Sequence, residues 1–138
     1  VEKVPSILSR TYPELGRTLG EALLEPHCRY YPLLEPVLPL IKGMSHITGG
    51  GLSENVPRVL PKGLGARFDT STWEVPPIFT LIQEAGQVER GEMFDVFNMG
   101  VGMVLACAPD KTDEVRRLVP EARVVGEVVK GGEVILSR

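Results

Sequence analysis

The spacing of apolar residues along the chain predicts several short helices. Residues 75–86 open with two prolines, place apolar side chains three and four positions apart, and end at a glycine, as an amphipathic helix does. Residues 31–42 show the same spacing, although Pro36 and Pro39 each remove a backbone donor from that helix. Further helical segments are expected at residues 52–60, 91–98 and 111–119.

Short runs of apolar and β-branched residues predict the strands. Residues 44–48 lead into a glycine triplet, residues 65–70 alternate as a half-buried strand, and residues 100–108 form a buried run. Two last runs, residues 122–129 and 131–137, flank a Lys-Gly-Gly turn, which predicts a terminal β-hairpin. Helices set among strands, with an antiparallel hairpin at the end, predict an α+β fold in which a mixed or antiparallel sheet is layered with helices.

Length and composition are those of one folded domain. The chain has 138 residues, of which 43% are hydrophobic and 24% charged, so it can bury about 70% of the surface that its unfolded form exposes. Residues 1–17 show weak periodicity and are expected to form an N-terminal arm or interdomain linker, with residues 18–138 as the domain. The chain starts without methionine, which suggests a piece of a longer protein.

Charge and hydropathy argue against two classes of partner. The net charge is −3, so the domain lacks the broad basic surface that neutralises a nucleic-acid backbone. The longest apolar run, residues 100–109, is too short to cross a bilayer, and the first residues lack a signal-peptide pattern. We therefore expect no nucleic-acid partner, no membrane association and a cytoplasmic location.

Amide and cysteine content adds two smaller expectations. Twelve prolines stand against two asparagines and two glutamines, a composition that fits a thermophilic source. The two cysteines, Cys28 and Cys107, are too few for a disulfide framework. Cys107 lies in an apolar run, where a thiol acts as a small buried hydrophobe.

The most informative local pattern is the glycine triplet Gly49, Gly50 and Gly51. Successive glycines after a strand can take positive φ angles and turn their amides to one side, which forms a concave site for an anion such as phosphate. No lysine follows the triplet, so the phosphate-binding motif of nucleotide hydrolases is absent. A plain turn is the alternative interpretation of the same residues.

The neighbours of the triplet have side chains that suit a reactive site. His46 can exchange a proton near neutral pH, Glu54 and Asn55 can orient a substrate amide or amine, and Arg58 can pair with a phosphate. The alternative is structural: a core histidine, an ion pair between Glu54 and Arg58, and a helix cap at Asn55.

Other reactive groupings are not visible in the sequence. Its histidines and cysteines lack the spacing of zinc ligands, its aspartates are scattered, and there is no nucleophile elbow. No metal site is therefore expected. From the residues alone, the chain is an α+β domain with a candidate anion-binding loop.

Two motifs carry a resemblance to a known family. HITGGGLSENVPRVLP at residues 46–61 and FNMGVGM at residues 97–103 closely resemble the C-terminal domain of phosphoribosylformylglycinamidine cyclo-ligases, also called aminoimidazole ribonucleotide synthetases. Residues 19–26 and 72–103 follow the order of the family as well, so the resemblance covers nearly the whole chain from residue 18 onward. It implies the C-terminal-domain fold of that superfamily, which is α+β and partly ferredoxin-like.

The resemblance implies one half of a two-domain ligase of de novo purine biosynthesis. The family's enzyme uses ATP to close the imidazole ring of formylglycinamidine ribonucleotide, giving aminoimidazole ribonucleotide. Its N-terminal domain, which holds ATP and Mg²⁺ and builds the homodimer, has no counterpart in this sequence. The present chain is expected to be inactive without that domain.

The motif match also implies roles for particular residues in the cleft between the two domains. His46 would transfer a proton or orient an amide, as the catalytic residue. The residues implied in substrate or phosphate binding are Gly49, Gly50, Gly51, Asn55, Arg58, Asn98, Gly100 and Gly102.

One short stretch departs from the family pattern. After Pro26 the family has Thr-Arg-hydrophobic-Tyr, whereas this chain has His27, Cys28, Arg29 and Tyr30. Either Arg29 substitutes for the arginine, or that contact is not used. His27 is expected to be a residue of a surface loop.

Two other functions stay open. A sister ATP-using family with the same two-domain plan is one, such as formylglycinamidine ribonucleotide synthase or the selenide and thiamine-phosphate kinases. The other is a non-catalytic module that binds an anionic ligand.

Overall fold

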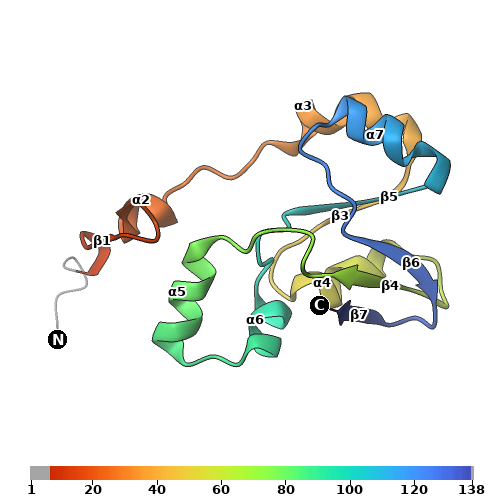
Figure 1. Ribbon diagram of the computed structural model, residues 1–138. Helices are drawn as coiled ribbons and strands as arrows, with labels where there is room; N and C mark the ends of the chain where they lie inside the picture. The colour runs from red at the N-terminus through yellow and green to blue at the C-terminus, as the bar shows by residue number, and fades with distance from the viewer. Residues whose placement is uncertain (1–6, 138) are drawn as a thin grey trace.

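The computed structural model describes residues 7–137. The chain forms an N-terminal arm, a two-stranded sheet covered by helices, and a three-stranded sheet beside two further helices (Figure 1). Helices and mixed sheets together confirm the α+β expectation.

The arm consists of a small hairpin and one helix. Strands β1 (Thr11–Tyr12) and β2 (Arg17–Thr18) pair antiparallel and lead into α2 (Leu19–Leu23). Thr18 caps α2, since its hydroxyl accepts from the Glu21 amide while the Glu21 carboxylate accepts from the Thr18 amide. An extended connection, residues 24–29, joins the arm to the rest of the chain (Figure 1).

The two-stranded sheet pairs β3 (Ile41–His46) with β5 (Met103–Cys107) in antiparallel orientation. Helices flank these strands in the sequence: α3 (Tyr30–Leu34), η1 (Glu35–Leu40), η3 (Pro109–Lys111) and α7 (Thr112–Leu118). Figure 1 shows α3 and α7 side by side over this sheet. Four apolar side chains are buried where they meet: Leu34, Val37, Val115 and Val119.

The three-stranded sheet has β4 (Leu64–Asp69) at its centre. β6 (Gly126–Lys130) pairs antiparallel on one side and β7 (Val134–Ser137) parallel on the other. The short helices α4 (Gly51–Asn55) and η2 (Val56–Val59) pack against it. The buried residues of this core are Ile47, Leu52, Val56, Ala66, Phe68 and Val101.

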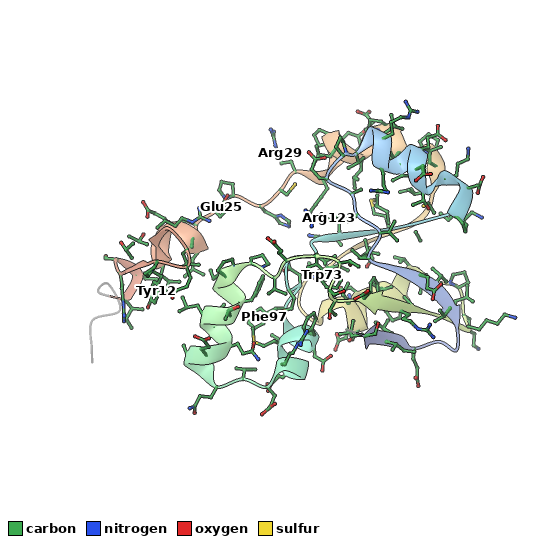
Figure 2. All side chains as sticks on the ribbon, viewed as in Figure 1. Tyr12, Glu25, Arg29, Trp73, Phe97 and Arg123 are labelled. Atoms are coloured by element: carbon green, nitrogen blue, oxygen red, sulfur yellow. The ribbon has the colours of Figure 1, made fainter. Side chains whose placement is uncertain are left out.

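The remaining helices are α5 (Pro77–Gly86) and α6 (Arg90–Val96). Met93 and Phe94 of α6 are buried with Met99, and one face of α5 packs against this cluster. Phe97 lies close to Phe79 of α5, with ring centroids 5.7 Å apart (Figure 2). The amphipathic helix expected at residues 75–86 is confirmed within two residues at its start.

The expectation of one helix over residues 31–42 is wrong beyond its first turn. The α-helix ends at Leu34, a 3-10 segment continues to Leu40, and Ile41 already pairs with Cys107 in the sheet. Pro36 and Pro39 explain the change, because a proline inside an α-helix removes a hydrogen bond and its ring clashes with the preceding turn.

The expected terminal hairpin is also wrong. Strands β6 and β7 do not pair with each other, because β4 lies between them. Their connection crosses the start of β4, where the Gly131 amide donates to the Gly63 carbonyl and the Ala66 amide donates to the Glu133 carbonyl. A Cβ on Gly65 would lie 1.9 Å from that Glu133 oxygen, so glycine is what lets the chain pass.

Candidate functional site

The two glycine-rich motifs meet at one end of the β3–β5 sheet. Because the strands are antiparallel, the segment after β3 and the segment before β5 lie at the same edge. The Ile47 amide donates to the Gly102 carbonyl at 3.0 Å, which joins the two segments directly. Residues far apart in the sequence therefore form one surface.

The first segment is the glycine triplet. Gly50 and Gly51 have φ angles of +92° and +56°, a region that favours glycine. Gly51 also lacks space for a side chain, since a Cβ would lie 1.9 Å from the Phe94 carbonyl oxygen. The Gly51 amide donates to Thr48, whereas the amides of Gly49 and Gly50 make no hydrogen bond within residues 7–137. Two main-chain donors are therefore open at this edge.

Asn55 holds the triplet in shape. Its side chain is 4% exposed, and its amide nitrogen donates to the carbonyls of Thr48, Gly49 and Gly51 at 3.3, 3.2 and 2.8 Å. Buried amide donors used in this way orient the backbone around them. The structure therefore makes Asn55 a positioning residue for the loop.

A charged pair borders the loop. The Arg58 guanidinium donates to the Asn55 amide oxygen at 3.2 Å and lies 3.7 Å from the Glu54 carboxylate, with both charged side chains mostly exposed. The Glu54 carboxylate folds over Gly50, since a Cβ built there would lie 2.5 Å from Oε2. Arg58 can therefore pair with Glu54 and still lie near a bound anion. The Glu54 carboxylate must move, however, before an anion reaches Gly50.

The second segment uses its glycines for packing. The Gly100 amide donates to the Asn98 side chain at 3.0 Å, and a Cβ on Gly100 would lie 2.6 Å from Pro76. Trp73 Nε1 donates to the Met99 carbonyl at 3.0 Å (Figure 2). These bonds fix the turn that leads into β5.

Gly102 makes room for an aromatic side chain. A Cβ at this position would lie 1.8 Å from the Tyr30 hydroxyl oxygen, so only glycine accommodates the phenol. Burial raises the pKa of Tyr30, and the charge of the Cys28 thiolate raises it further.

His46 stands at the end of β3, exposed beside the triplet. Its Nε2 lies 3.0 Å from Nε2 of His27. The Tyr30 ring meets both imidazoles edge-on, with centroid distances of 5.5 Å to His27 and 5.9 Å to His46. His27 therefore belongs to the site, and the sequence signal that marks it is the departure from the family pattern after Pro26. Arg29 points away from the connection (Figure 2).

The structure thus places the predicted catalytic and binding residues in or beside two segments that meet at one edge of the β3–β5 sheet, and their roles stay predictions. Cys107, expected to be buried, is half-buried, with its sulfur 3.8 Å from the Thr112 hydroxyl. Among the described residues, no group of three or more His, Cys, Asp and Glu side chains is arranged to hold a metal ion.

A separate groove of about 1080 Å³ runs between the two sheets. Its walls are largely apolar, and it reaches Tyr30 and Gly102 but neither His46 nor the glycine triplet. The residues that carry the open amides therefore do not line this groove. Along residues 7–137, none of the helices combines the length and apolarity needed to cross a lipid bilayer.

Fold and site together define an α+β domain that presents open main-chain amides next to an imidazole. The chain belongs to the family described as AIR synthase related protein, C-terminal domain, which matches residues 3–137.

Individual relatives agree with the family. The chain is 49% identical over 133 residues to a phosphoribosylformylglycinamidine cyclo-ligase of Desulfitobacterium hafniense, covering 90% of this chain and 38% of that protein. It is 48% identical over 139 residues to the enzyme of the same name from Bacillus cytotoxicus, covering 94% of this chain and 39% of that protein. The chain therefore spans well under half the length of these curated relatives.

A solved structure shares the fold. The crystal structure of HypE, a hydrogenase maturation protein of E. coli, matches with a TM-score of 0.60 and 22% sequence identity, over 94% of this chain and 45% of that one. At this identity the likeness concerns the fold alone.

Proposed function

We propose that this chain is the C-terminal domain of a phosphoribosylformylglycinamidine cyclo-ligase. The whole enzyme uses ATP to convert formylglycinamidine ribonucleotide into aminoimidazole ribonucleotide in de novo purine biosynthesis. The observation that carries the proposal is the edge where His46, two open glycine amides and the Asn98–Gly102 turn come together, in a chain 49% identical to a relative of that name.

The reaction requires two steps at the formyl group of the substrate. The formyl amide oxygen of the substrate first attacks the γ-phosphorus of ATP, which releases ADP and leaves a phosphate ester on that oxygen. A substrate nitrogen then attacks the formyl carbon, which carries that oxygen. The carbon–oxygen bond breaks, and inorganic phosphate leaves as the ring closes. The attacking nitrogen loses one proton, so the site must supply a base and donors for phosphate oxygens.

His46 is the group that can take this proton. It is exposed at the edge, its imidazole has a nitrogen that can accept a proton, and it lies next to the open amides in the chain. General bases of this kind contribute about 10²–10⁴-fold to rate.

The amides of Gly49 and Gly50 are the donors for phosphate oxygens. Main-chain amides that point the same way form anion-binding concavities. Asn55 fixes the loop carbonyls behind them, and Arg58 adds a positive charge that can reach an anion once Glu54 moves aside. Asn98, Gly100 and Gly102 shape the neighbouring wall through the bonds described above, and their role in substrate binding is to hold that wall in place.

ATP and Mg²⁺ would be held by the N-terminal part of the enzyme. The described residues offer no carboxylate cluster for Mg²⁺. The relatives are much longer than the chain. The expected partner is therefore the N-terminal domain, which would also build the homodimer. The chain by itself should therefore be inactive.

Mixing experiments test this division of labour. Calorimetry with formylglycinamidine ribonucleotide and with ATP is performed on the chain alone and after addition of the N-terminal domain. Ring closure only in the mixture supports the cyclo-ligase. Binding of an anion without turnover in the mixture indicates a non-catalytic module, turnover of a different substrate indicates a sister ATP-using family, and ATP hydrolysis by the chain alone contradicts the assignment.

A further inference from the structure

We propose that His27 is the positioning partner of His46, holding its imidazole in the tautomer that can accept the substrate proton. The inference rests on the proposed function and deepens it, because it concerns the same site. It adds a residue that the family motif does not supply.

The two imidazoles are joined edge to edge through one pair of nitrogens. Nε2 of His27 and Nε2 of His46 are 3.0 Å apart, and the ring planes are tilted by 33°. At this distance one nitrogen must carry the hydrogen and the other must accept it. Each ring therefore fixes the tautomer of the other.

Only one of the two arrangements leaves His46 able to act as a base. If His46 Nε2–H donates to His27, then Nδ1 of His46 keeps a free lone pair and can take a proton from the substrate nitrogen. If His27 donates instead, Nδ1 of His46 carries the hydrogen and the ring has no free acceptor. A base at this position therefore needs His27 as the acceptor.

The two neutral imidazoles accept one extra proton more readily than two. When His46 takes the substrate proton at Nδ1, its bond to neutral His27 becomes charge-assisted and stronger. A second proton would place hydrogens on both Nε2 atoms and two positive charges at hydrogen-bond distance, which is unfavourable. The hydrogen bond to His27 therefore supports His46 as the ring that receives the substrate proton.

The surroundings hold the pair in place without competing for its proton. Tyr30 presses its ring edge against both imidazoles, at interplanar angles of 87° and 63°, while its hydroxyl sits against Gly102. Burial raises the pKa of Tyr30, so its phenol stays neutral where imidazoles titrate. Cys28 on the connection is a further titratable group, whose charge acts on Tyr30, and β5 contributes uncharged Met103 opposite His46.

The first test needs no turnover. The chain has two histidines, so nitrogen NMR of the imidazoles gives one signal set for each. We expect His46 as the Nε2–H tautomer and His27 as the Nδ1–H tautomer at pH 8. His27→Ala should make His46 a mixture of tautomers. A mixture of tautomers at His46 in the unchanged chain, or the Nδ1–H tautomer there, would overturn the proposal.

The second test measures turnover in the enzyme formed with the N-terminal domain. His27→Ala should lower kcat about tenfold with little change in KM and alter the pH profile, while His27→Gln, which restores an acceptor near the same point, should recover most of the loss. Leu24→Ala, at an 82% exposed position of the same connection, is the control for disturbance of the chain. Equal losses in His27→Ala and His27→Gln would contradict the positioning role.

The two tests separate this inference from the proposed function. If NMR shows the hydrogen-bonded pair in the unchanged chain but the His46→Ala mixture keeps full activity, the pair exists and His46 takes no part in the reaction. Inactivity of every mixture would remove the function and leave the NMR result to decide on the pair.

Discussion

The two glycine-rich segments at the sheet edge use glycine for different purposes. In the triplet, the amides of Gly49 and Gly50 make no hydrogen bond within the described residues. In the second segment, the missing side chains of Gly100 and Gly102 are replaced by Pro76 and Tyr30. The comparison teaches that neighbouring glycines can leave amides without partners or make room for packing, and that only the structure separates the two uses.

The largest expected effect concerns the side chain next to the open amides. In the enzyme formed with the N-terminal domain, His46→Ala should lower kcat by about 10²–10⁴-fold, because the ring-closing nitrogen loses its base. Steady-state kinetics measures it, with exposed Lys42 of the same strand changed to alanine as the control. Unchanged kcat in His46→Ala would return this histidine to a structural role.

The next effect separates two glycines of the triplet. Gly51→Ala should lower the free energy of unfolding by about 3 kcal/mol, because a positive φ and a close backbone contact both oppose a Cβ. Gly49 has open space around its Cα, so Gly49→Ala should cost less than about 0.5 kcal/mol. Urea denaturation at constant m-value measures both. Similar losses for the two variants would mean that the loop is not packed as described.

The two asparagines of the edge provide a smaller contrast. Asn55 is buried and donates to three carbonyls, whereas half-buried Asn98 accepts one bond from Gly100. Asn55→Ala should cost about 2 kcal/mol of unfolding free energy and Asn98→Ala about 1 kcal/mol. Thermal and urea unfolding measure the two changes in unfolding free energy. A larger loss of stability for Asn98→Ala than for Asn55→Ala would contradict the conclusion that Asn55 is the asparagine that holds its segment in place.

The smallest effect concerns charge at the loop. Glu54→Gln removes the carboxylate that lies over Gly50, so binding of inorganic phosphate should tighten about threefold, with less gain at high salt. Calorimetry on the chain measures it, and Glu84→Gln, at an exposed position of α5, controls for net charge. Equal gains in the two variants would show a general charge effect instead of a local one.

Local patterns allowed part of the fold to be predicted from the sequence. The helix α5 follows from apolar spacing and its flanking prolines and glycine, which act within a few residues. The helix over residues 31–42 failed because Pro36 and Pro39 outweighed the apolar spacing. The hairpin failed because a turn sequence says nothing about β4, the strand that lies between its two arms.

The site could be predicted only as a set of residues. The motifs named the triplet, His46 and the Asn98–Gly102 turn, but their meeting depends on the long-range pairing of β3 with β5. His27 was missed because its partner is distant in the sequence. The domain boundary at residue 18 and the thermophilic source stay predictions, and a Tm above about 60 °C would agree with the second.

Amide NMR of the chain during titration with inorganic phosphate tests the central claim most directly, which is that the triplet offers open main-chain donors to an anion. The account predicts that the amide signals of Gly49 and Gly50 shift most, while those of Gly100, bonded to Asn98, and Gly102 shift little. Unmoved signals for Gly49 and Gly50, or larger shifts at Gly100 and Gly102, would contradict it.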